Sequence, residues 1–388
     1  MATRPLRILF LVEEMEAITA GGTERQILQM IRLLREAQME PEICIFRDTA
    51  WLTEDVAGCP VHNAGIGKLL SVRATPQFWR LVRWMRTKRF DVVQTFFIEA
   101  NILGPILARF AGVPLILGSR RNLNYWMKPH HLVLQRISNR FVSRLVANCE
   151  AVRQKVSEME AFPLGRIDVV YNSIDAEQFR PDPEMRRRVR NELQIGEEQV
   201  VIGNVSTLRP VKGVQHFVAA AALVRDRAPA ARFVVIGDGP LRPAIEQQIA
   251  DLQLGPVFRL LGSQEEIAPY LQAMDIAVLS SESEGFSNSI LEYMAAGLPC
   301  VATDVGGNRE ALGDAAGTIV PPADASVLAE ALLSVINDPN RRRDLAAKNL
   351  ARMVAVFSLQ SARAGLVDYY CCTLKFRGNA QRQRETNT

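Results

Sequence analysis

The sequence predicts an α/β protein made of two doubly wound, Rossmann-like domains. Its 388 residues exceed one typical domain and suit two of about 150–200 residues each. Short apolar runs alternate with segments of helical periodicity along most of the chain, which favours parallel sheets covered by helices on both faces. The alternation breaks once, around residues 172–175, Pro181 and Pro183, and then resumes. Because open parallel sheets bind ligands beyond the carboxyl ends of their strands, we expect the two domains to face each other across a cleft.

The break in the pattern sets the expected domain limits. We expect a first domain over residues 1–178 and a second over 179–358. A last helical segment over 359–375 would return to the first domain. The polar residues 376–388 would form a disordered tail.

Each expected domain has its own series of strands and helices. In the first domain, apolar runs predict strands over residues 7–12, 42–46, 91–96, 114–118, 145–148 and 167–171. Helical spacing predicts helices there over 23–35, 75–88, 98–111 and 130–144. In the second domain, strands are expected over 200–205, 233–236, 258–261, 276–279 and 299–303. Helices are expected over 184–193, 214–227, 325–337 and 341–357.

Composition limits the class of protein. Apolar residues make up 48% of the chain and charged residues 23%, as in ordinary soluble domains. The N-terminus lacks the layout of a signal peptide, and no apolar run of about eighteen residues predicts a membrane span. The six cysteines form no C-x-x-C pair, which favours a reducing compartment. We therefore expect a cytoplasmic protein, and we expect no nucleic acid partner.

The positive charge is unevenly placed. The net charge of +4 comes from the first half of the chain, which would favour an anionic acceptor or an anionic membrane surface. The helix expected over 75–88 carries Trp79 and Trp84 beside a row of arginines and a lysine. Two interpretations remain open for it. It covers the first sheet with a solvated basic face, or it lies on the cytoplasmic face of the inner membrane as a peripheral contact.

The stretch 276–303 predicts a strand, a helix and a second strand that carry two carboxylates, Glu284 and Glu292. The loop after the first strand leads to a helix N-terminus near Ser287 and Asn288. Backbone N–H groups and the positive end of the helix dipole favour an anion there. A diphosphate suits this position, and a carboxylate can accept hydrogen bonds from the hydroxyls of an attached sugar.

Glu284 and Glu292 lie within the stretch E-G-F-S-N-S-I-L-E-Y-M-A-A-G-L-P. This stretch resembles the E-x7-E signature of retaining nucleotide-sugar glycosyltransferases with the GT-B fold, family 4, also called glycosyl transferases group 1. The resemblance covers about residues 5–375. It implies that Glu292 accepts hydrogen bonds from both ribose hydroxyls and that Glu284 contacts hydroxyls of the donor hexose. The donor-binding residues of the same loop would be Gly285, Phe286, Ser287 and Asn288.

The resemblance also implies an activity. The protein would be a hexosyltransferase that moves a hexose from a UDP- or GDP-sugar to a glycan or lipid-linked acceptor. Its place would be bacterial surface polysaccharide biosynthesis, of lipopolysaccharide or exopolysaccharide. The nucleotide sugar is a substrate, and no cofactor is expected.

Two cations are expected to neutralise the diphosphate as it leaves. Enzymes do this with a divalent metal or with lysines, arginines and helix dipoles. No D-x-D motif occurs in the chain, so we expect no metal site. Lys212, followed by glycine, matches the family's Lys-Gly pair, while Thr207 stands where the family usually has arginine. We expect Lys212 and Arg209 to bind the diphosphate together and, with Glu284, to be the catalytic residues.

A second glycine-rich loop follows the strand over 233–236. Gly237, Asp238, Gly239 and Arg242 match the family's G-D-G-P-L-R stretch, which lines the nucleotide pocket. A plain strand-to-helix turn explains the same residues equally well.

In the first domain, Gly21 and Gly22, with Glu24, resemble the family's G-G-x-E loop, which approaches the donor phosphate and the acceptor. Glycines there let the backbone close on a ligand without a Cβ in the way. Glu24 would orient this loop, or it would cap the following helix, where acids are favoured.

One departure from the family concerns the sugar pocket. Many relatives carry a histidine after the strand expected here over 114–118, and this chain has none there. Ser119, Arg120 or Arg121 would then serve the sugar pocket or an anionic acceptor.

The sequence leaves the reaction course open. Retention by double displacement needs a carboxylate nucleophile close to the anomeric carbon. The family implies instead an attack on the same face, in which the departing phosphate oxygen helps to deprotonate the acceptor. Two alternatives to transfer also remain: a nucleotide-sugar epimerase with the same fold, and a nucleotide-sugar-binding protein without turnover.

Overall fold

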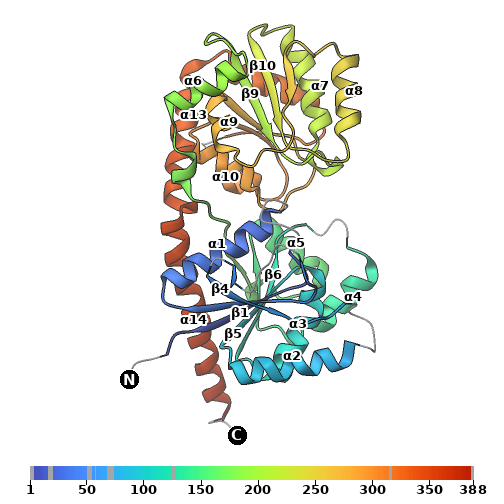
Figure 1. Cartoon of the computed structure of the whole chain (residues 1–388), viewed down its shortest axis with the longest axis vertical. Helices are drawn as coiled ribbons and strands as arrows, with labels where there is room; N and C mark the ends of the chain where they lie inside the picture. Colours follow the sequence, from blue (N-terminus) through green and yellow to red (C-terminus); the bar gives the residue numbers. More distant parts are fainter. Residues whose placement is uncertain are drawn as a thin grey trace. The chain divides into compact units, whose positions relative to one another are not determined.

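A computed structural model describes residues 4–15, 21–49, 55–56, 58–67, 74–123, 127–313 and 317–385 of the chain (Figure 1). It divides the chain into two compact units, Met1–Asn172 with Gln360–Thr388, and Ser173–Leu359. The second unit begins a few residues before the predicted limit at 178. It does so because the N–H of Ile174 donates to the carbonyl oxygen of Phe357 in that unit (3.3 Å).

The first unit contains one sheet with strand order β3-β4-β2-β1-β5-β6-β7-β8. All neighbouring strands are parallel except β3, which pairs antiparallel with β4 at the edge. The strands are β1 (Arg7–Val12), β2 (Glu40–Ile45), β3 (Asp55–Val56), β4 (Cys59–Asn63), β5 (Val92–Phe96), β6 (Leu115–Arg120), β7 (Arg144–Ala147) and β8 (Ile167–Val169). The predicted parallel sheet is confirmed, and β3 and β4 are additions that the apolar pattern did not predict.

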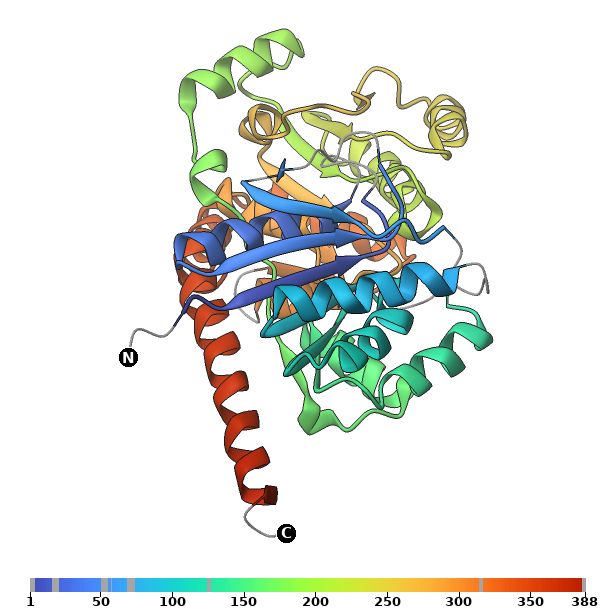
Figure 2. The same cartoon turned by 60° about the horizontal axis from the view of Figure 1, so that its bottom comes forward.

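Helices cover both faces of this first sheet. They are α1 (Gly22–Glu36), α2 (Thr75–Lys88), α3 (Ile98–Ala111), α4 (Pro129–Ser138), α5 (Glu150–Glu160) and α14 (Leu359–Glu385). Figure 2 shows α2 and α3 against one face, while α1 lies on the other with α14. On the α2 and α3 face, buried side chains of Leu9, Leu11 and Val93 pack against Leu81 and Leu107.

The second unit contains a fully parallel sheet with strand order β11-β10-β9-β12-β13-β14. The strands are β9 (Val200–Val205), β10 (Ala231–Ile236), β11 (Phe258–Leu260), β12 (Ile276–Leu279), β13 (Cys300–Thr303) and β14 (Gly317–Val320). The helices are α6 (Pro183–Glu192), α7 (Val214–Arg225), α8 (Arg242–Asp251), α9 (Ala268–Ala273), α10 (Asn288–Ala295), α11 (Asn308–Leu312), α12 (Ala325–Ile336) and α13 (Pro339–Arg352). The order places β9 and β12 side by side, although they are far apart in the sequence.

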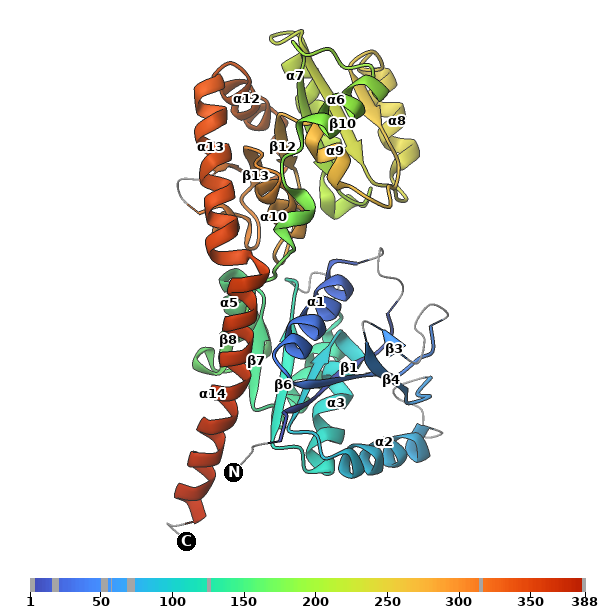
Figure 3. The same cartoon turned by 60° about the vertical axis from the view of Figure 1, so that its left-hand side comes forward.

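The second sheet is also covered on both faces. In Figure 3, α7, α8 and α12 lie on one side of the strands, and α9, α10 and α13 on the other. A cluster of three phenylalanines, Phe217, Phe233 and Phe258, fills the centre of the first of these layers, with ring centroids 5.5–5.9 Å apart. Among the described helices, none combines the length and apolar character that a membrane crossing requires.

The last helix, α14, packs against the first unit. Tyr370 is fully buried, and its hydroxyl donates to Oε1 of Gln94 on β5. The amide of Gln94 donates in turn to Oγ of Ser119 on β6 (2.9 Å). A second tyrosine, Tyr369, donates to the carboxylate of Asp168 on β8 (3.0 Å). The two tyrosine bonds tie the returning segment to β5 and β8 of the first sheet.

The predicted disordered tail is corrected by this helix. Helix α14 continues to Glu385, well past the predicted limit at 375. Once a helix is nucleated and anchored, each further residue adds one backbone hydrogen bond, so polar residues with good helix propensity prolong it. Residues 386–388 lie outside the described residues.

Replacing Tyr370 with phenylalanine tests the anchoring of α14. The change leaves a buried acceptor on Gln94 without its donor, so the first unit should lose about 1–3 kcal/mol of unfolding free energy. All four tryptophans lie within residues 1–172, so tryptophan fluorescence during urea unfolding reports on this unit. Asp368→Asn, at an exposed position of the same helix, is the control and should stay within about 0.5 kcal/mol of the wild type. Equal effects of the two changes would mean that Gln94 does not hold the helix.

Candidate functional site

Lys212 and Glu284, which the sequence places in separate loops, form an ion pair in the second unit. Lys212 Nζ donates to Glu284 Oε1 at 2.6 Å, and Ser281 Oγ donates to the same oxygen at 2.7 Å. The side chain of Glu284 is only 9% exposed, and that of Lys212 is 26% exposed. Such shielding from water fixes both groups in one orientation. Two predicted catalytic residues therefore lie at one point beyond the carboxyl ends of β9 and β12.

Backbone contacts between the two loops hold this pair in place. The N–H of Glu282 donates to the carbonyl oxygen of Val211 (2.8 Å), and Ser280 Oγ donates to that of Lys212 (3.2 Å). Gly213 has a φ of +59°, and a Cβ there would lie 2.1 Å from the carbonyl oxygen of Ser280. Only glycine permits both the backbone conformation and this close approach.

Helix α10 carries the second predicted carboxylate, Glu292, which is 2% exposed. Its neighbour Tyr293 is fully buried, and the Tyr293 hydroxyl accepts the N–H of Val205 at 2.7 Å. Ser289 Oγ donates to the carbonyl oxygen of Val205 at 3.0 Å. These two bonds tie α10 to the end of β9, the strand that leads to Lys212. Tyr293 positions α10, and the sequence analysis did not predict this role. The sequence feature that could have indicated it is a tyrosine within an apolar helix, because a buried hydroxyl needs a hydrogen-bond partner.

The loop that enters α10 is held by the loop after β13. The N–H of Gly307 donates to the carbonyl oxygen of Gly285 at 2.7 Å. Phe286 is 5% exposed, and its ring packs against Phe357 with centroids 5.5 Å apart. The phenyl ring thus belongs to the core, so the ring itself does not face a ligand. Ser287 is the N-cap residue of α10, and Asn288 is its first residue.

The G-D-G-P-L-R loop lies beside the Lys212 loop. The N–H of Leu208 donates to the carbonyl oxygen of Asp238 at 2.9 Å. A Cβ on Gly237 would lie 2.0 Å from the carbonyl oxygen of Ser206, and one on Gly239 would lie 2.7 Å from that of Leu208. The glycines are therefore required by the approach of the two loops, whether or not a nucleotide binds there.

The two predicted arginines of these loops differ in their surroundings. Arg242 pairs with the carboxylates of Asp238 (3.3 Å) and Glu246 (2.8 Å). Arg209 is exposed, and its guanidinium makes no hydrogen bond or ion pair with any other residue that the structure describes. Arg209 is thus available to an incoming anion, whereas Arg242 would have to leave its partners.

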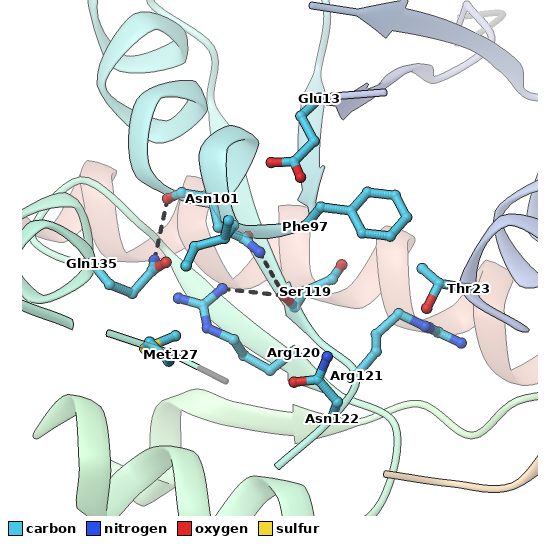
Figure 4. Close-up of a pocket in the computed structure, with 11 residues that line it drawn as sticks. Glu13, Thr23, Phe97, Asn101, Ser119, Arg120, Arg121, Asn122, Met127 and Gln135 are labelled. Atoms are coloured by element: carbon cyan, nitrogen blue, oxygen red, sulfur yellow. Dashed lines mark hydrogen bonds between the residues drawn. The ribbon is translucent and has the colours of Figure 1, made fainter. Parts of the chain in front are cut away.

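The first unit has a cavity of about 210 Å³ beyond the carboxyl ends of β1, β5 and β6. Among the residues that line it are Glu13, Thr23, Phe97, Asn101, Ser119 and Gln135. Figure 4 shows Glu13 at one end of this cavity and Arg120, Arg121 and Asn122 at the other.

Glu13 directly follows β1 and was not predicted as a site residue. Its Oε2 accepts the N–H of Glu99, in the first turn of α3, at 2.6 Å. Burial raises the pKa of the Glu13 carboxyl from its ordinary value of 4.5 to about 7, and the charges of Glu99 and Glu14 add to the rise. The bond from Glu99 and the charge of Arg47 oppose it. Strongly shifted acids in a cavity are candidates for a functional role, and an acid directly after an apolar strand was the available sequence signal.

Two of the three residues that were expected to replace the family's histidine are held in the interior. Arg120 is 4% exposed and donates to both oxygens of Glu160, at 2.6 and 2.8 Å. Ser119 is 3% exposed and accepts the amide of Gln94. Both line the cavity, but Arg120 is committed to the ion pair with Glu160 on α5.

Arg121 is the third of these residues. Burial lowers the pKa of its guanidinium to about 10, while Cys149 and Glu24 act in the opposite direction. It therefore stays protonated near neutral pH. Its Nη2 donates to Oδ1 of Asn172 at 2.5 Å.

Gly21, Gly22 and Glu24 lie at the start of α1. Gly21 is the N-cap residue and Gly22 the first helical residue. Glu24 is 8% exposed, and a Cβ on Gly21 would lie 2.0 Å from its Oε2. The carboxylate thus folds back to the N-terminus of its own helix, where the dipole favours a negative charge. This geometry fits the helix-capping interpretation of Glu24. Across the described part of the chain, no three His, Cys, Asp or Glu side chains gather as metal ligands.

Family comparisons match both units. The family "Glycosyl transferases group 1" matches residues 185–352, which include the Lys212–Glu284 pair and Glu292. The family "Glycosyl transferase 4-like domain" matches residues 21–173. The chain belongs to the group 1 glycosyltransferases. The predicted enzyme class is thereby confirmed.

Individual relatives of this glycosyltransferase carry transferase names. A UDP-Gal:α-D-GlcNAc-diphosphoundecaprenol α-1,3-galactosyltransferase from Escherichia coli is 26% identical over 304 residues, which span 74% of this chain and 78% of the relative. A D-inositol 3-phosphate glycosyltransferase from Streptosporangium roseum is 27% identical over 392 residues, which span 90% of this chain and 88% of the relative.

Among solved structures, Anabaena HepE in complex with UDP superposes with a TM-score of 0.84 at 21% identity. The match covers 95% of this chain and all of HepE. This likeness confirms the predicted GT-B fold class of two Rossmann-like domains.

The raised pKa of Glu13 predicts a pH-dependent stability. Between pH 4.5 and about 7 the unfolded chain is ionised at Glu13 while the folded chain keeps the proton, so the folded wild type loses stability as the pH rises through this window. Glu13→Gln does not titrate, so its Tm relative to the wild type should increase from pH 4.5 to about 7 and stay constant above. Calorimetry over this range checks the expectation.

The neighbouring Glu14→Gln is the matched control. Glu14 pairs with Arg47 at 2.7 Å, and its side chain is 40% exposed. A Tm difference for Glu13→Gln that does not change with pH would contradict the shifted pKa.

Proposed function

We propose that the protein is a retaining hexosyltransferase that uses a UDP- or GDP-sugar as donor. The main observation behind this proposal is the ion pair between Lys212 and Glu284 at 2.6 Å. Next to it, the bond between Tyr293 and Val205 holds α10 at the end of β9. Lys212 and the exposed Arg209 supply positive charge for a diphosphate. The nearby carboxylates of Glu284 and Glu292 are suited to accept hydrogen bonds from hexose and ribose hydroxyls.

The comparisons support a nucleotide-sugar donor and a glycan or lipid-linked acceptor. HepE has been solved with UDP and with UDP-glucose. The relative from Escherichia coli is named for a lipid-linked diphosphate acceptor. We further propose that the enzyme acts in the cytoplasm, in bacterial surface polysaccharide biosynthesis.

We further propose that the diphosphate is stabilised without a metal ion. Lys212 is only partly exposed, and Glu284 holds its ammonium in one orientation, from which it is suited to donate to a nearby phosphate. Backbone N–H groups at the start of α10 would add to this field.

In the proposed reaction, the bond between the anomeric carbon and the phosphate oxygen breaks, and its electron pair leaves with the nucleotide diphosphate. The acceptor oxygen forms the new bond on the same face, and its proton passes to the departing phosphate oxygen. Lys212 and Arg209 hold the diphosphate through this step. Glu284 and Glu292 orient the hexose and the ribose, which brings the reacting atoms together.

Two other functions are consistent with the same pocket. An epimerase would release nucleotide without an acceptor, and a binding protein would release none. Nucleotide diphosphate release from a panel of UDP- and GDP-sugars, measured with and without acceptor, separates these cases. Release that depends on an acceptor supports transfer, and release that ignores the acceptor contradicts it.

Substitutions at the proposed donor site should weaken UDP binding. Lys212→Ala removes the cation and Glu292→Ala removes the ribose acceptor, so each should raise the Kd by about 10- to 100-fold. Calorimetric titration with UDP and with GDP measures this effect. Lys348→Ala, at a surface lysine of α13 that pairs with Asp344, is the control and should leave the Kd unchanged. Normal binding by both site variants would show that the site is misplaced.

We also propose that the first unit contacts anionic membranes through one basic, aromatic surface. Trp79 on α2 is 59% exposed, and Phe110 at the end of α3 is 54% exposed. The centroids of their rings lie 6.1 Å apart. Arg80 and Arg83 are exposed on the same helix. Aromatic side chains beside arginines are suited to the headgroup region of an anionic bilayer. Trp84, by contrast, stacks on a histidine ring, so it is not part of this surface.

Cosedimentation with vesicles tests this membrane contact. The wild type should bind vesicles that contain phosphatidylglycerol and should bind pure phosphatidylcholine weakly. Reversing Arg80 and Arg83 to glutamate should lower binding by about tenfold or more, since each basic residue near such a surface contributes about 1 kcal/mol. Arg343→Glu, on the exposed side of α13, is the control. Equal binding by the wild type and the double variant would exclude this surface.

A further inference from the structure

We propose that His216 and Gln215, in the first turn of α7, are positioning residues for the donor site. Their side chains hold the carboxylate of Glu282 on the loop after β12. Through Glu282 they keep this loop in the conformation in which Glu284 pairs with Lys212. The inference rests on the proposed glycosyl transfer, and it identifies residues that act on the site without touching the donor.

The carboxylate of Glu282 accepts two hydrogen bonds on one oxygen. Nε2 of His216 donates to Oε1 of Glu282 at 2.8 Å, and Nε2 of Gln215 donates to the same atom at 3.0 Å. Because an ionised carboxylate only accepts hydrogen bonds, Nε2 of His216 must carry the hydrogen in this contact. The side chain of His216 is 24% exposed and that of Glu282 is 43% exposed. Two donors from neighbouring residues therefore fix an acid that the solvent reaches.

Both the backbone and the side chain of Glu282 connect it to the loop that carries Lys212. Its N–H donates to the carbonyl oxygen of Val211, directly before Lys212, at 2.8 Å. Its side chain is held by α7, which begins directly after Gly213. The ring of His216 lies against Gly213, because a Cβ there would be 3.3 Å from Cδ2 of the ring. Glu282 is thus attached to the chain on both sides of Lys212.

The start of α7 is a rigid support for these donors. Val214 and Phe217 are buried in the core of the second unit. Nε2 of Gln248 on α8 donates to the carbonyl oxygen of Gln215 at 3.0 Å. Side chains that start from a packed helix are held more precisely than side chains that start from a loop.

The amide of Gln215 is oriented by its contact with Glu282. Its Oε1 is buried and has no hydrogen-bond partner among the described residues. A buried acceptor without a partner costs free energy. Turning the amide over would place this oxygen against the carboxylate oxygen of Glu282, which is worse. The amide therefore keeps its N–H on Glu282 and leaves its own oxygen unpaired.

These contacts give each acid of the loop its own partners. Glu284 accepts a hydrogen bond from Lys212. Glu282, two residues earlier, accepts from His216 and Gln215 instead. Without these donors, Glu282 would be a mobile carboxylate that competes with Glu284 for the same ammonium. It would also add an unpaired negative charge to the loop that receives the diphosphate.

A positioning role predicts an effect on donor binding rather than on stability. Ion pairs between partly exposed side chains contribute little to the free energy of unfolding. A loosened loop, by contrast, displaces Lys212 from the place where it binds the diphosphate. We therefore expect the Tm to stay near that of the wild type while nucleotide binding weakens.

His216→Leu tests this expectation, because leucine keeps much of the bulk of the ring and removes the donor. The Kd for UDP or GDP, whichever the wild type binds, and the donor KM should rise by about 3- to 10-fold, with the acceptor KM unchanged. His216→Gln, which restores an N–H of similar reach, should bind like the wild type. Arg227→Leu is the control: it breaks an exposed pair with Glu330 just after the end of α7 and should leave the Kd unchanged.

A double-mutant cycle shows whether the effect passes through Lys212. If His216 acts only by holding the loop that pairs with Lys212, His216→Leu should cause no further loss in the Lys212→Ala background. It should likewise have no further effect in the Glu282→Ala background. A full additional loss in either background would overturn the inference, because His216 would then act on binding by another route.

A spectroscopic readout reports on Lys212 without any ligand. In full-length protein with ¹³C-labelled lysine, the Cε signal absent from Lys212→Ala identifies this residue. The signal should shift in His216→Leu and keep its wild-type position in His216→Gln and Arg227→Leu.

These results separate the inference from the proposed function. If neither UDP nor GDP binds the wild type but the Lys212 signal shifts in His216→Leu, the proposed function fails and the positioning role stands. If a nucleotide binds through Lys212 but His216→Leu changes neither its Kd nor the Lys212 signal, the inference is overturned and the proposed function stands.

Discussion

The ion pair between Lys212 and Glu284 is the interaction on which the candidate donor site depends. It joins two loops that come from distant parts of the chain and meet because β9 and β12 are neighbours in the second sheet. The side chain of a fully solvated lysine samples many conformations, so its ammonium group has no fixed position. Here a shielded carboxylate directs it, and the backbone bond from Glu282 to Val211 keeps the loops at a fixed separation. Charge that is already oriented needs no rearrangement when a diphosphate forms, which is the condition for electrostatic stabilisation of a leaving group.

Other contacts in the second unit hold the helix and the loops around this ion pair in place. Tyr293 ties α10 to β9, so the helix that carries Glu292 cannot move away from the strand that leads to Lys212. Glycines at 213 and 237 let neighbouring loops touch where a Cβ would collide with a carbonyl oxygen. A single layer of loops thus combines positive charge, carboxylate acceptors and close backbone contacts. This combination is what a sugar attached to a diphosphate requires.

The first unit uses the same architecture with different chemistry. Its cavity also lies beyond the carboxyl ends of parallel strands, but Glu13 at one end of it is an acid whose ionisation is opposed by burial. Two of its arginines, Arg47 and Arg120, are engaged by carboxylates, so the unit does not offer a dense anion site there. A polar, weakly charged cavity of this kind offers little to a nucleotide diphosphate.

The sequence by itself determined the repeated α/β pattern, the two parallel sheets and the position of the E-x7-E acids. Hydrophobic periodicity and local turn residues carry this information, because they act over a few neighbouring residues. Strand β9, for example, has the predicted limits, and so do helices α2 and α3. The sequence also assigned Lys212 and Glu284 to one candidate site, since each lies in a loop that follows an apolar strand.

Tertiary structure alone decided the features that depend on distant partners. Glu13 and Glu14 are adjacent acids with the same local sequence signal, yet only Glu13 enters a cavity and lies against the start of α3. Arg120 was expected to face a ligand, but Glu160 on another helix pairs with it. The bond of the Tyr293 hydroxyl and the strained backbone of Phe97 likewise follow from packing. Burial and through-space contacts set these properties, and neither is encoded in the spacing of residues along the chain.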